Sequence, residues 1–242
     1  MKSMLDLDDH HWWYRGRRRI IRSELDRLPL PPHASVLDAG CGSGRTLIEL
    51  TSYGDVQGIE LDPGAAEVAR GRGVGEVRIG RLEELPWDPD TFDLITCLDV
   101  IEHTPDDRVA LSALRAVSKP GSWLLVTVPA YQALWSQHDE DNHHFRRYSR
   151  RMLCAAAAGS GWTLRRLTSF NSLLLAPAAA VRVAQRWRTS TDYKSDLELG
   201  PTWLNSALER PLQLEAGWLS RGRTLPAGLS LLAVLQKPGP TA

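Results

Sequence analysis

The sequence has little of what a secreted or membrane-spanning protein requires. Its three cysteines, Cys41, Cys97 and Cys154, are widely spaced and form no CxxC pair, which argues against a disulfide framework and a zinc ribbon. The longest apolar run, at 173–181, is about half of the ~20 residues that a membrane-spanning helix needs. The N-terminus shows no apolar stretch of the kind that marks a secretory signal. These absences predict a cytoplasmic protein with no transmembrane segment.

The formal net charge of the chain is zero, but the positive and negative residues are concentrated in different parts of the sequence. Residues 35–140 contain 8 Lys or Arg and 18 Asp or Glu, a net charge of −10. Residues 141–242 contain 14 and 6, a net charge of +8. Binding to nucleic acid favours a basic surface overall, so we expect no nucleic-acid partner. The basic C-terminal part suits a small-molecule substrate that is anionic or amphiphilic.

Short apolar runs alternate with helical patterns over much of the chain. Strands are expected at 35–39, 56–61, 76–80, 92–98, 122–128, 162–170 and 229–237. Pro63 and Pro105 stand near predicted helix starts, and Lys119-Pro120-Gly121 follows a predicted helix end. Strand and helix in alternation predict a doubly wound α/β fold with a parallel sheet.

The pattern weakens after residue 128. A loop-rich piece at 129–148 precedes a helix that we expect to begin after Ser149, and a poorly patterned stretch occupies 171–227. Insertions of this kind carry specificity in such folds. Within the second, VRVAQRWR at 181–188 is interpreted as part of a lid over the active site, and peripheral contact with a membrane surface is the alternative.

A glycine-rich motif, VLDAGCGSG at 36–44, joins the first predicted strand to a helix. Its alternating glycines let the backbone approach a ligand closely, and the helix start offers free N–H groups. Glu60 ends the second predicted strand, where an acid can accept both hydroxyls of a ribose. Asp38, two residues before the first glycine, would repel a pyrophosphate and suits a cofactor with a cationic amino-acid part.

With this acid and glycine spacing, the motif resembles the D/E-x-G-x-G-x-G signature of class I S-adenosylmethionine-dependent methyltransferases. The resemblance covers roughly residues 11–170 and resumes in the final strand. It implies a Rossmann-like, mostly parallel seven-stranded sheet with helices on both faces and C-terminal insertions. The organisation that it implies is an N-terminal helical segment covering the cofactor site (1–34), an S-adenosylmethionine-binding core (35–170), an insertion or lid (171–227), and a final strand with a tail (228–242).

The resemblance also implies which residues contact S-adenosylmethionine. Those in the core are Asp38, Gly40, Gly42, Gly44, Glu60, Leu61, Leu82, Glu83 and Leu98. Arg81 stands where the family commonly has an adenine-binding acid, so that contact is expected to fall to Leu82 or Glu83. The segment HWWYRGRRR at 11–19 is similar to one bacterial branch of the family and adds Trp13, Arg17 and Arg18. A basic amphipathic helix with its tryptophans packed on the sheet edge is the alternative.

The stretch SQHDEDNHHFRRYSRR at 136–151 follows the fifth predicted strand. It resembles an LWSxxDxxxxHxRRY pattern of the same branch, which implies a wall of the substrate pocket. Histidine ordinarily titrates near neutrality, so His144 and His103 are the candidate bases, with Asp139 as an orienting partner. A solvated loop is the alternative for these histidines.

A metal site is the competing interpretation of Asp99, Glu102 and His103, which are spaced to share one face of a helical turn. A similar turn in ubiquinone-pathway O-methyltransferases uses a divalent cation. We favour helix capping and substrate contact by these residues, and therefore no metal.

The predicted reaction is methyl transfer to an O or N nucleophile of a small molecule. The product would be a specialised metabolite or a lipid-, quinone- or glycan-related compound, and the protein a monomer or homodimer. The rivals are C-methylation or a non-methyl use of the cofactor, a non-catalytic partner subunit, and a nicotinamide dehydrogenase, which the glycine spacing disfavours.

Overall fold

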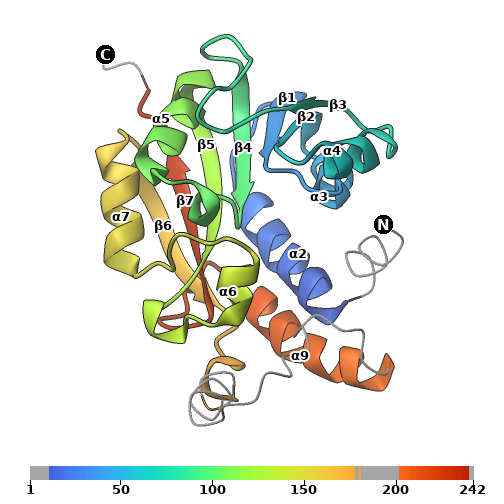
Figure 1. Ribbon diagram of the computed structural model, residues 1–242, viewed down its shortest axis with the longest axis vertical. Helices are drawn as coiled ribbons and strands as arrows, with labels where there is room; N and C mark the ends of the chain where they lie inside the picture. The colour runs from blue at the N-terminus through green and yellow to red at the C-terminus, as the bar shows by residue number, and fades with distance from the viewer. Residues whose placement is uncertain (1–10, 178–179, 181–201, 240–242) are drawn as a thin grey trace. The chain divides into compact units, whose positions relative to one another are not determined.

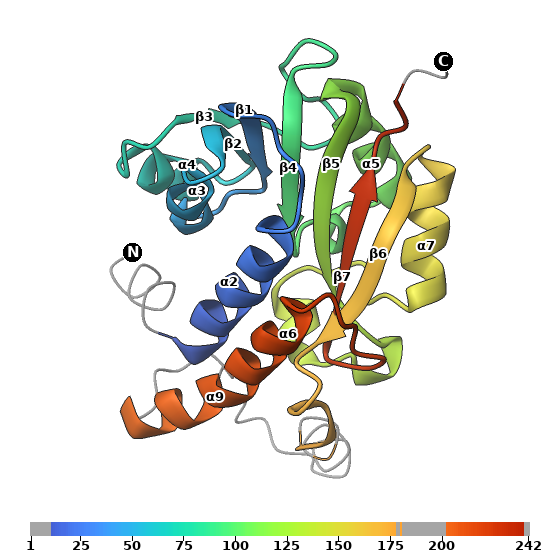
Figure 2. The ribbon, with the colours of Figure 1, turned by 180° about the vertical axis from the view of Figure 1, so that it is seen from behind.

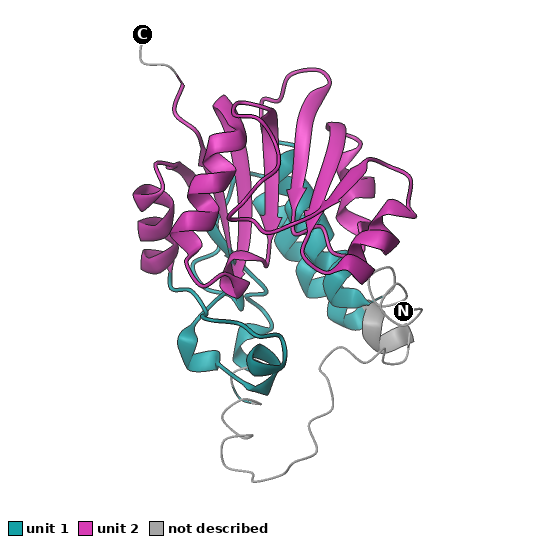
Figure 3. Ribbon diagram, turned by 45° about the horizontal axis from the view of Figure 1, so that its top comes forward, with its two compact units in different colours: residues 1–27, 129–149, 168–231 teal, residues 28–128, 150–167, 232–242 magenta. Residues whose placement is uncertain are grey.

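The computed structural model describes residues 11–177, 180 and 202–239. Two compact units divide the chain (Figure 3): unit 1 comprises residues 1–27, 129–149 and 168–231, and unit 2 comprises 28–128, 150–167 and 232–242. Both predicted insertions, 129–148 and 171–227, therefore belong to unit 1. The segment 181–188, interpreted above as part of a lid, lies outside the described residues, and the four-part domain organisation stays a prediction.

A seven-stranded sheet, most of it in unit 2, carries the fold. Its strands are β1 (Ala34–Ala39), β2 (Gly54–Glu60), β3 (Glu76–Ile79), β4 (Phe92–Leu98), β5 (Ser118–Pro129), β6 (Thr163–Phe170) and β7 (Ser230–Gln236). They lie in the order β3-β2-β1-β4-β5-β7-β6. The pairs β1–β2, β1–β4, β2–β3 and β4–β5 are parallel, whereas β7 runs opposite to β4 (Figures 1 and 2). The predicted α/β fold with a mostly parallel sheet is confirmed.

Several helices begin at side-chain caps that the sequence provides. They are α2 (Trp12–Leu25), α3 (Arg45–Leu50), α4 (Pro63–Arg70), α5 (Asp107–Val117), α6 (Gln137–Asp141), α7 (Arg150–Gly159), α9 (Thr202–Leu219) and the short turns η1 (Ile101–His103) and η2 (Gln132–Leu134). Asp62 accepts a hydrogen bond from the Ala65 N–H at the start of α4, and Asp106 does the same for Arg108 at the start of α5. Helix α3 packs on β1 and β2, and α4 on β2 and β3. Among the described residues, no helix is long and apolar enough to span a bilayer.

Strand β5 begins earlier than the sequence pattern indicates. Lys119-Pro120-Gly121 follow the end of α5, as predicted, but they already lie inside the strand, which was expected to start at residue 122. The pairing with β4 passes from Phe92 opposite Ser118 to Leu94 opposite Trp123, which is a bulge. Proline, which has no N–H, and a glycine in the left-handed conformation (Gly121, φ 82°) are the residues that a bulge accommodates.

Helix α9 was not predicted, because the stretch that contains it has no clear helical pattern and Pro211 interrupts it. In unit 1 this helix lies beside α2 (Figures 1 and 2). The buried Glu209 carboxylate pairs with the guanidinium of Arg19 at 2.7 Å and with that of Arg15 at 3.4 Å. Gly16 permits the close approach, because a Cβ there would lie 2.6 Å from the Cβ of Leu212. The contact between the helices thus depends on a small residue and on buried charge.

We predict that Gly16→Ala lowers the melting temperature. Alanine is favoured over glycine in a helix by ~1 kcal/mol, but overpacking at a buried contact costs ~1–3 kcal/mol. Gly217→Ala in α9 is the matched control, because its Cβ would meet only the Arg221 guanidinium at 3.7 Å. Thermal unfolding should show a loss for the first variant and none for the second. Equal gains in both variants would contradict the close packing at Gly16.

Candidate functional site

The glycine-rich turn follows β1 in unit 2. Gly40, Gly42 and Gly44 all have positive φ, at 80°, 53° and 77°, a conformation that favours glycine. The N–H groups of Gly40 and Cys41 both donate to the carbonyl oxygen of Ile59, at 2.8 and 3.0 Å, which fastens the turn to β2. The local sequence therefore sets the shape of the turn, and β2 fixes its place.

The three glycines have different surroundings. A Cβ on Gly40 would lie 2.5 Å from Val100 Cγ2, and one on Gly44 would lie 2.8 Å from Ala69 Cβ. A Cβ on Gly42 would meet no atom within 4 Å. The outer glycines are thus required by packing within the protein, whereas Gly42 borders open space in which a ligand can approach the backbone.

Glu60 ends β2 beside this open space. Its Oε2 accepts the Gly42 N–H at 2.8 Å and its Oε1 accepts the Asp62 N–H at 2.9 Å. Each carboxylate oxygen has two acceptor positions, so this pair of bonds leaves acceptor capacity for hydroxyl groups such as those of a ribose. Leu61, the next residue, is 58% exposed and presents an apolar surface.

Asp38 is buried within β1. Its Oδ1 accepts a hydrogen bond from the Thr96 hydroxyl on β4 at 2.6 Å, and the two residues are direct partners in the strand pairing. Thr96 was not predicted, because its contact follows from the register of two strands that are distant in sequence. The bond fixes the carboxylate that the sequence assigns to the cationic part of a cofactor.

The remaining predicted cofactor residues of unit 2 lie at other strand ends. Leu82 and Leu98 are buried, and Glu83 lies 3.9 Å from the guanidinium of Arg81, the residue that replaces the expected acid. Arg72, which was not predicted, donates from Nε to the Ser43 carbonyl at 2.6 Å and holds the glycine-rich turn from the side of α4. The cofactor roles of these residues stay predictions.

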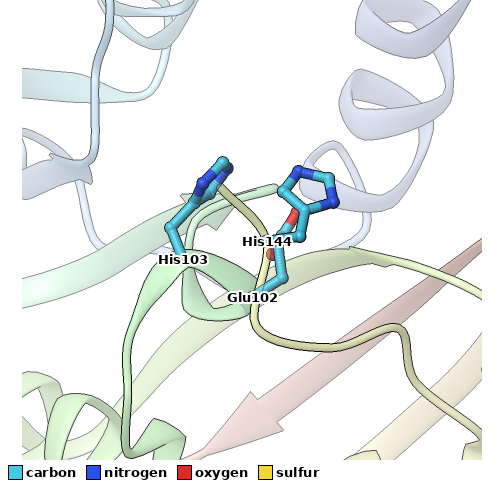
Figure 4. Close-up of side chains that lie close together, drawn as sticks. All are labelled: Glu102, His103 and His144. Atoms are coloured by element: carbon cyan, nitrogen blue, oxygen red, sulfur yellow. The ribbon is translucent and has the colours of Figure 1, made fainter. Parts of the chain in front are cut away.

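The predicted cation turn after β4 differs from the expected α-helical geometry. Residues 101–103 form a 3₁₀ turn, and Asp99 precedes it with a positive φ of 57°. Glu102 is fully buried whereas His103 is exposed, although a carboxylate oxygen of the first and a ring nitrogen of the second lie within 4.8 Å (Figure 4). The three side chains therefore do not share one exposed face.

The candidate base belongs to unit 1. The His144 ring, also drawn in Figure 4, bonds through Nδ1 to Asp139 Oδ1 at 2.9 Å. Asp139 is fully buried at the end of a capping box with Ser136, whose N–H donates to Oδ2 at 2.9 Å. Burial alone would raise the pKa of Asp139, but hydrogen bonds from His144 and Arg147 outweigh it and hold that pKa below its ordinary value. The expected contact between Asp139 and His144 is therefore present.

Unit 1 also shows backbone strain. Tyr131, two residues after the end of β5, has φ 61° and ψ 104°, outside the regions that non-glycine residues favour. His143 and Asn171 have φ of 55° and 59°. Strained backbone of this kind is concentrated at functional sites, which agrees with the predicted role of the segment that contains Tyr131 and His143.

The predicted N-terminal contacts lie on α2. Arg17 is buried, and its guanidinium carbon lies 5.3 Å from the centroid of the Trp13 ring, whereas Arg18 is half-buried. The segment is a helix that begins at Trp12, capped by the ring of His11. Its contact with a cofactor stays a prediction.

Comparison with known proteins agrees with this geometry. A family model described as a methyltransferase domain matches residues 12–167. Ubiquinone biosynthesis O-methyltransferase of Thiobacillus denitrificans is 31% identical over 130 residues, which are 48% of this chain and 56% of that protein. The chain thus spans about half the length of the curated relatives that it matches.

Solved structures share the fold. A chain of the complex between the Haloferax volcanii Trm112 methyltransferase activator and a methyltransferase superposes with a TM-score of 0.63 at 19% identity, covering 98% of this chain and 93% of that one. Geranyl diphosphate C-methyltransferase of Streptomyces coelicolor, solved with S-adenosyl-L-homocysteine, gives 0.61 at 14% identity, covering 90% and 78%.

A glycine turn with open space at Gly42, next to an acid at the end of the second strand, is the arrangement with which α/β proteins bind nucleoside-containing cofactors. The chain belongs to the methyltransferase-domain family. The predicted membership in a methyltransferase family is confirmed.

We predict that Gly42→Ala weakens S-adenosylmethionine binding by at least about tenfold, or ~1.4 kcal/mol, because the methyl group enters the open space. Gly121→Ala is the matched control, since Gly121 also has a positive φ and open surroundings but lies in the bulge of β5. Both variants carry the strain of a left-handed alanine, ~1–2 kcal/mol, so this strain does not distinguish them. Only Gly42→Ala places a methyl group in the proposed cofactor space, and only this variant should lose affinity in calorimetry. Equal affinities in the two variants would exclude the turn as the binding site.

We also predict that calorimetric titration with MgCl₂ gives the same result for the wild type and for Glu102→Gln, namely no specific binding. This follows if Asp99, Glu102 and His103 cap the turn and contact substrate. Stoichiometric heat in the wild type that disappears in the variant would instead make the turn a cation site.

Proposed function

We propose that this protein transfers the methyl group of S-adenosylmethionine to an oxygen or nitrogen nucleophile of a small molecule, with a hydroxyl as the favoured acceptor. The observation that carries the proposal is the left-handed glycine turn, whose Gly42 borders open space next to Glu60, within a match to a methyltransferase domain. The relatives named as ubiquinone biosynthesis O-methyltransferases favour oxygen over nitrogen.

The residues present fit this cofactor. The buried Asp38 offers a carboxylate to its amino-acid part, and Glu60 has acceptor capacity for its ribose hydroxyls. The exposed Leu61 offers an apolar surface to a base. The proposed set of cofactor-binding residues also includes Leu82, Glu83, Leu98, Trp13, Arg17 and Arg18. When bound, S-adenosylmethionine supplies a methyl group activated by a sulfonium.

His144 is proposed as the base that accepts the proton of the acceptor hydroxyl. Because Asp139 is held ionised, it can only accept hydrogen bonds, so the Nδ1 of His144 must carry its proton toward Asp139 Oδ1. The second ring nitrogen, Nε2, is the atom that would accept the proton. His103 is the alternative base, and its exposure supports that assignment less than the fixed ring of His144 does.

The class of acceptor molecule is inferred from acid–base chemistry, because no sequence motif indicates it. A phenolic hydroxyl is acidic enough for a histidine to remove its proton during transfer. The positive charge of the C-terminal part of the sequence favours an anionic or amphiphilic molecule, as in biosynthesis of a specialised metabolite or of a lipid-, quinone- or glycan-related compound.

A screen tests the proposal. Purified protein is incubated with S-adenosylmethionine and matched acceptors that are phenols, ortho-diphenols and aromatic amines, each with and without an alkyl chain and a carboxylate. Mass spectrometry should show one added methyl on oxygen together with S-adenosylhomocysteine. Methylation on carbon, or cofactor binding without turnover of any acceptor, would argue against the proposal.

We predict that His144→Gln lowers kcat by ~10²–10⁴-fold with little change in cofactor affinity, the usual loss for a general base. His143→Asn is the control, because His143 is exposed and asparagine tolerates its left-handed backbone. Steady-state kinetics on the acceptor that gives the highest turnover measure both. A loss of less than threefold in His144→Gln would remove His144 as the base.

A further inference from the structure

The hydroxyl of Thr96 lies inside the sheet of unit 2 and contacts Asp38. Thr96 belongs to β4 and has no exposure to solvent. Its Oγ1 lies 2.6 Å from Asp38 Oδ1 and 3.4 Å from the carbonyl oxygen of Leu37. The shorter distance is typical of a hydroxyl that donates to a carboxylate, whereas the longer one exceeds the usual range for an O–H···O bond. The hydroxyl therefore directs its proton to Asp38.

The register of two strands places this donor. Strands β1 and β4 are parallel, and Asp38 and Thr96 are direct partners, so their side chains lie on the same face of the sheet. The partners that precede them, Leu37 and Ile95, are both fully buried. A shift of the register by one residue would turn the side chains of a strand to the other face, so the packed core opposes such a shift. The core thus fixes the position of the Thr96 hydroxyl before any ligand binds.

The carboxylate of Asp38 acts on the glycine-rich turn that follows it. Asp38 is buried and stands two residues before Gly40, the first glycine of the turn. Burial raises the pKa of the Cys41 thiol in the turn, and the negative charge of Asp38 raises that pKa further. The field of this carboxylate therefore reaches the segment in which Gly42 borders open space.

A carboxylate binds a cation best when it is already oriented, because no rearrangement then has to accompany binding. We propose that Thr96 is a positioning residue for the cofactor: its hydroxyl holds the Asp38 carboxylate in the orientation that binds the ammonium group of the amino-acid part. This assignment rests on the proposed function, which includes binding of S-adenosylmethionine at the glycine-rich turn. It concerns binding alone, so it can be measured without turnover.

The first experiment compares two ligands by calorimetry. One is S-adenosylhomocysteine, and the other is an analogue of it in which hydrogen replaces the α-amino group. Thr96→Val exchanges the hydroxyl for a methyl group of similar size. It should weaken binding of S-adenosylhomocysteine at least about tenfold, as expected when a hydrogen bond to a charged group is broken. The deamino analogue should bind wild type and variant equally within about threefold, because it has no ammonium group for Asp38.

Thr168→Val is the matched control, because Thr168 is a fully buried threonine of β6 whose hydroxyl accepts the Leu225 N–H at 2.9 Å. This variant also loses a buried hydroxyl, so it should lose stability without a change in the ratio of the two affinities. Equal losses for both ligands in Thr96→Val, or no loss for either, would overturn the proposal. A wild type that binds both ligands equally would also overturn it, since Asp38 would then not contact the ammonium group.

A second pair of variants covers the case in which valine at this position prevents folding. Thr96→Ser retains the hydroxyl, and Thr96→Ala differs from it by that oxygen alone. The serine variant should bind S-adenosylhomocysteine within about threefold of the wild type, and the alanine variant should show the selective loss expected for valine. Equal affinities in the serine and alanine variants would overturn the proposal, because the oxygen would then have no effect on cofactor binding.

Removal of the carboxylate separates positioning from a structural role. Asp38→Asn should lower the affinity for S-adenosylhomocysteine to about that for the deamino analogue. In this background Thr96→Val should change neither affinity, because Thr96 acts through Asp38. A further loss as large as in the wild-type background would show a merely structural role and overturn the assignment. The expected selective loss in a protein that methylates no acceptor would instead leave Thr96 assigned and count against the proposed methylation.

Discussion

The attachment of the glycine-rich turn to the end of β2 is the constraint on which the cofactor region depends. Three N–H groups of the turn donate across this junction, two to the carbonyl of Ile59 and one to the carboxylate of Glu60. A turn in left-handed conformation has few local hydrogen bonds of its own, so the neighbouring strand has to supply the acceptors. Glu60 therefore shapes the turn and also offers its remaining lone pairs to a ligand.

Much of the fold could be predicted because its signals are local. Apolar runs of strand length marked the sheet, and Pro63 marked the start of α4. Two elements depend on distant partners and could not be predicted in the same way. The bulge of β5 exists because β4 pairs on both sides of it, and α9 is stabilised by α2 despite Pro211.

The same distinction between local signals and distant partners applies to the candidate functional site. The glycine spacing together with Glu60 at the end of the next strand identified the glycine turn, and His144 stands five positions after Asp139. The contact of Arg147 with Asp139 was not visible, because Arg146, Arg150 and Arg151 surround Arg147 in a run that is typical of a solvated basic surface. Only burial and the bond to Asp139 distinguish it from its neighbours.

The pairing of α2 with α9 has a consequence for synthesis of the chain on the ribosome. Helix α2 ends at Leu25 and α9 begins at Thr202, so at ~5–20 residues per second the first helix waits about 10–35 s for its partner. Strands β1 to β5 are complete by Pro129 and have their parallel neighbours well before then. During that interval the nascent chain carries an amphipathic helix whose contact surface at Gly16 is uncovered, and exposed apolar surface of this kind is what makes chaperones necessary.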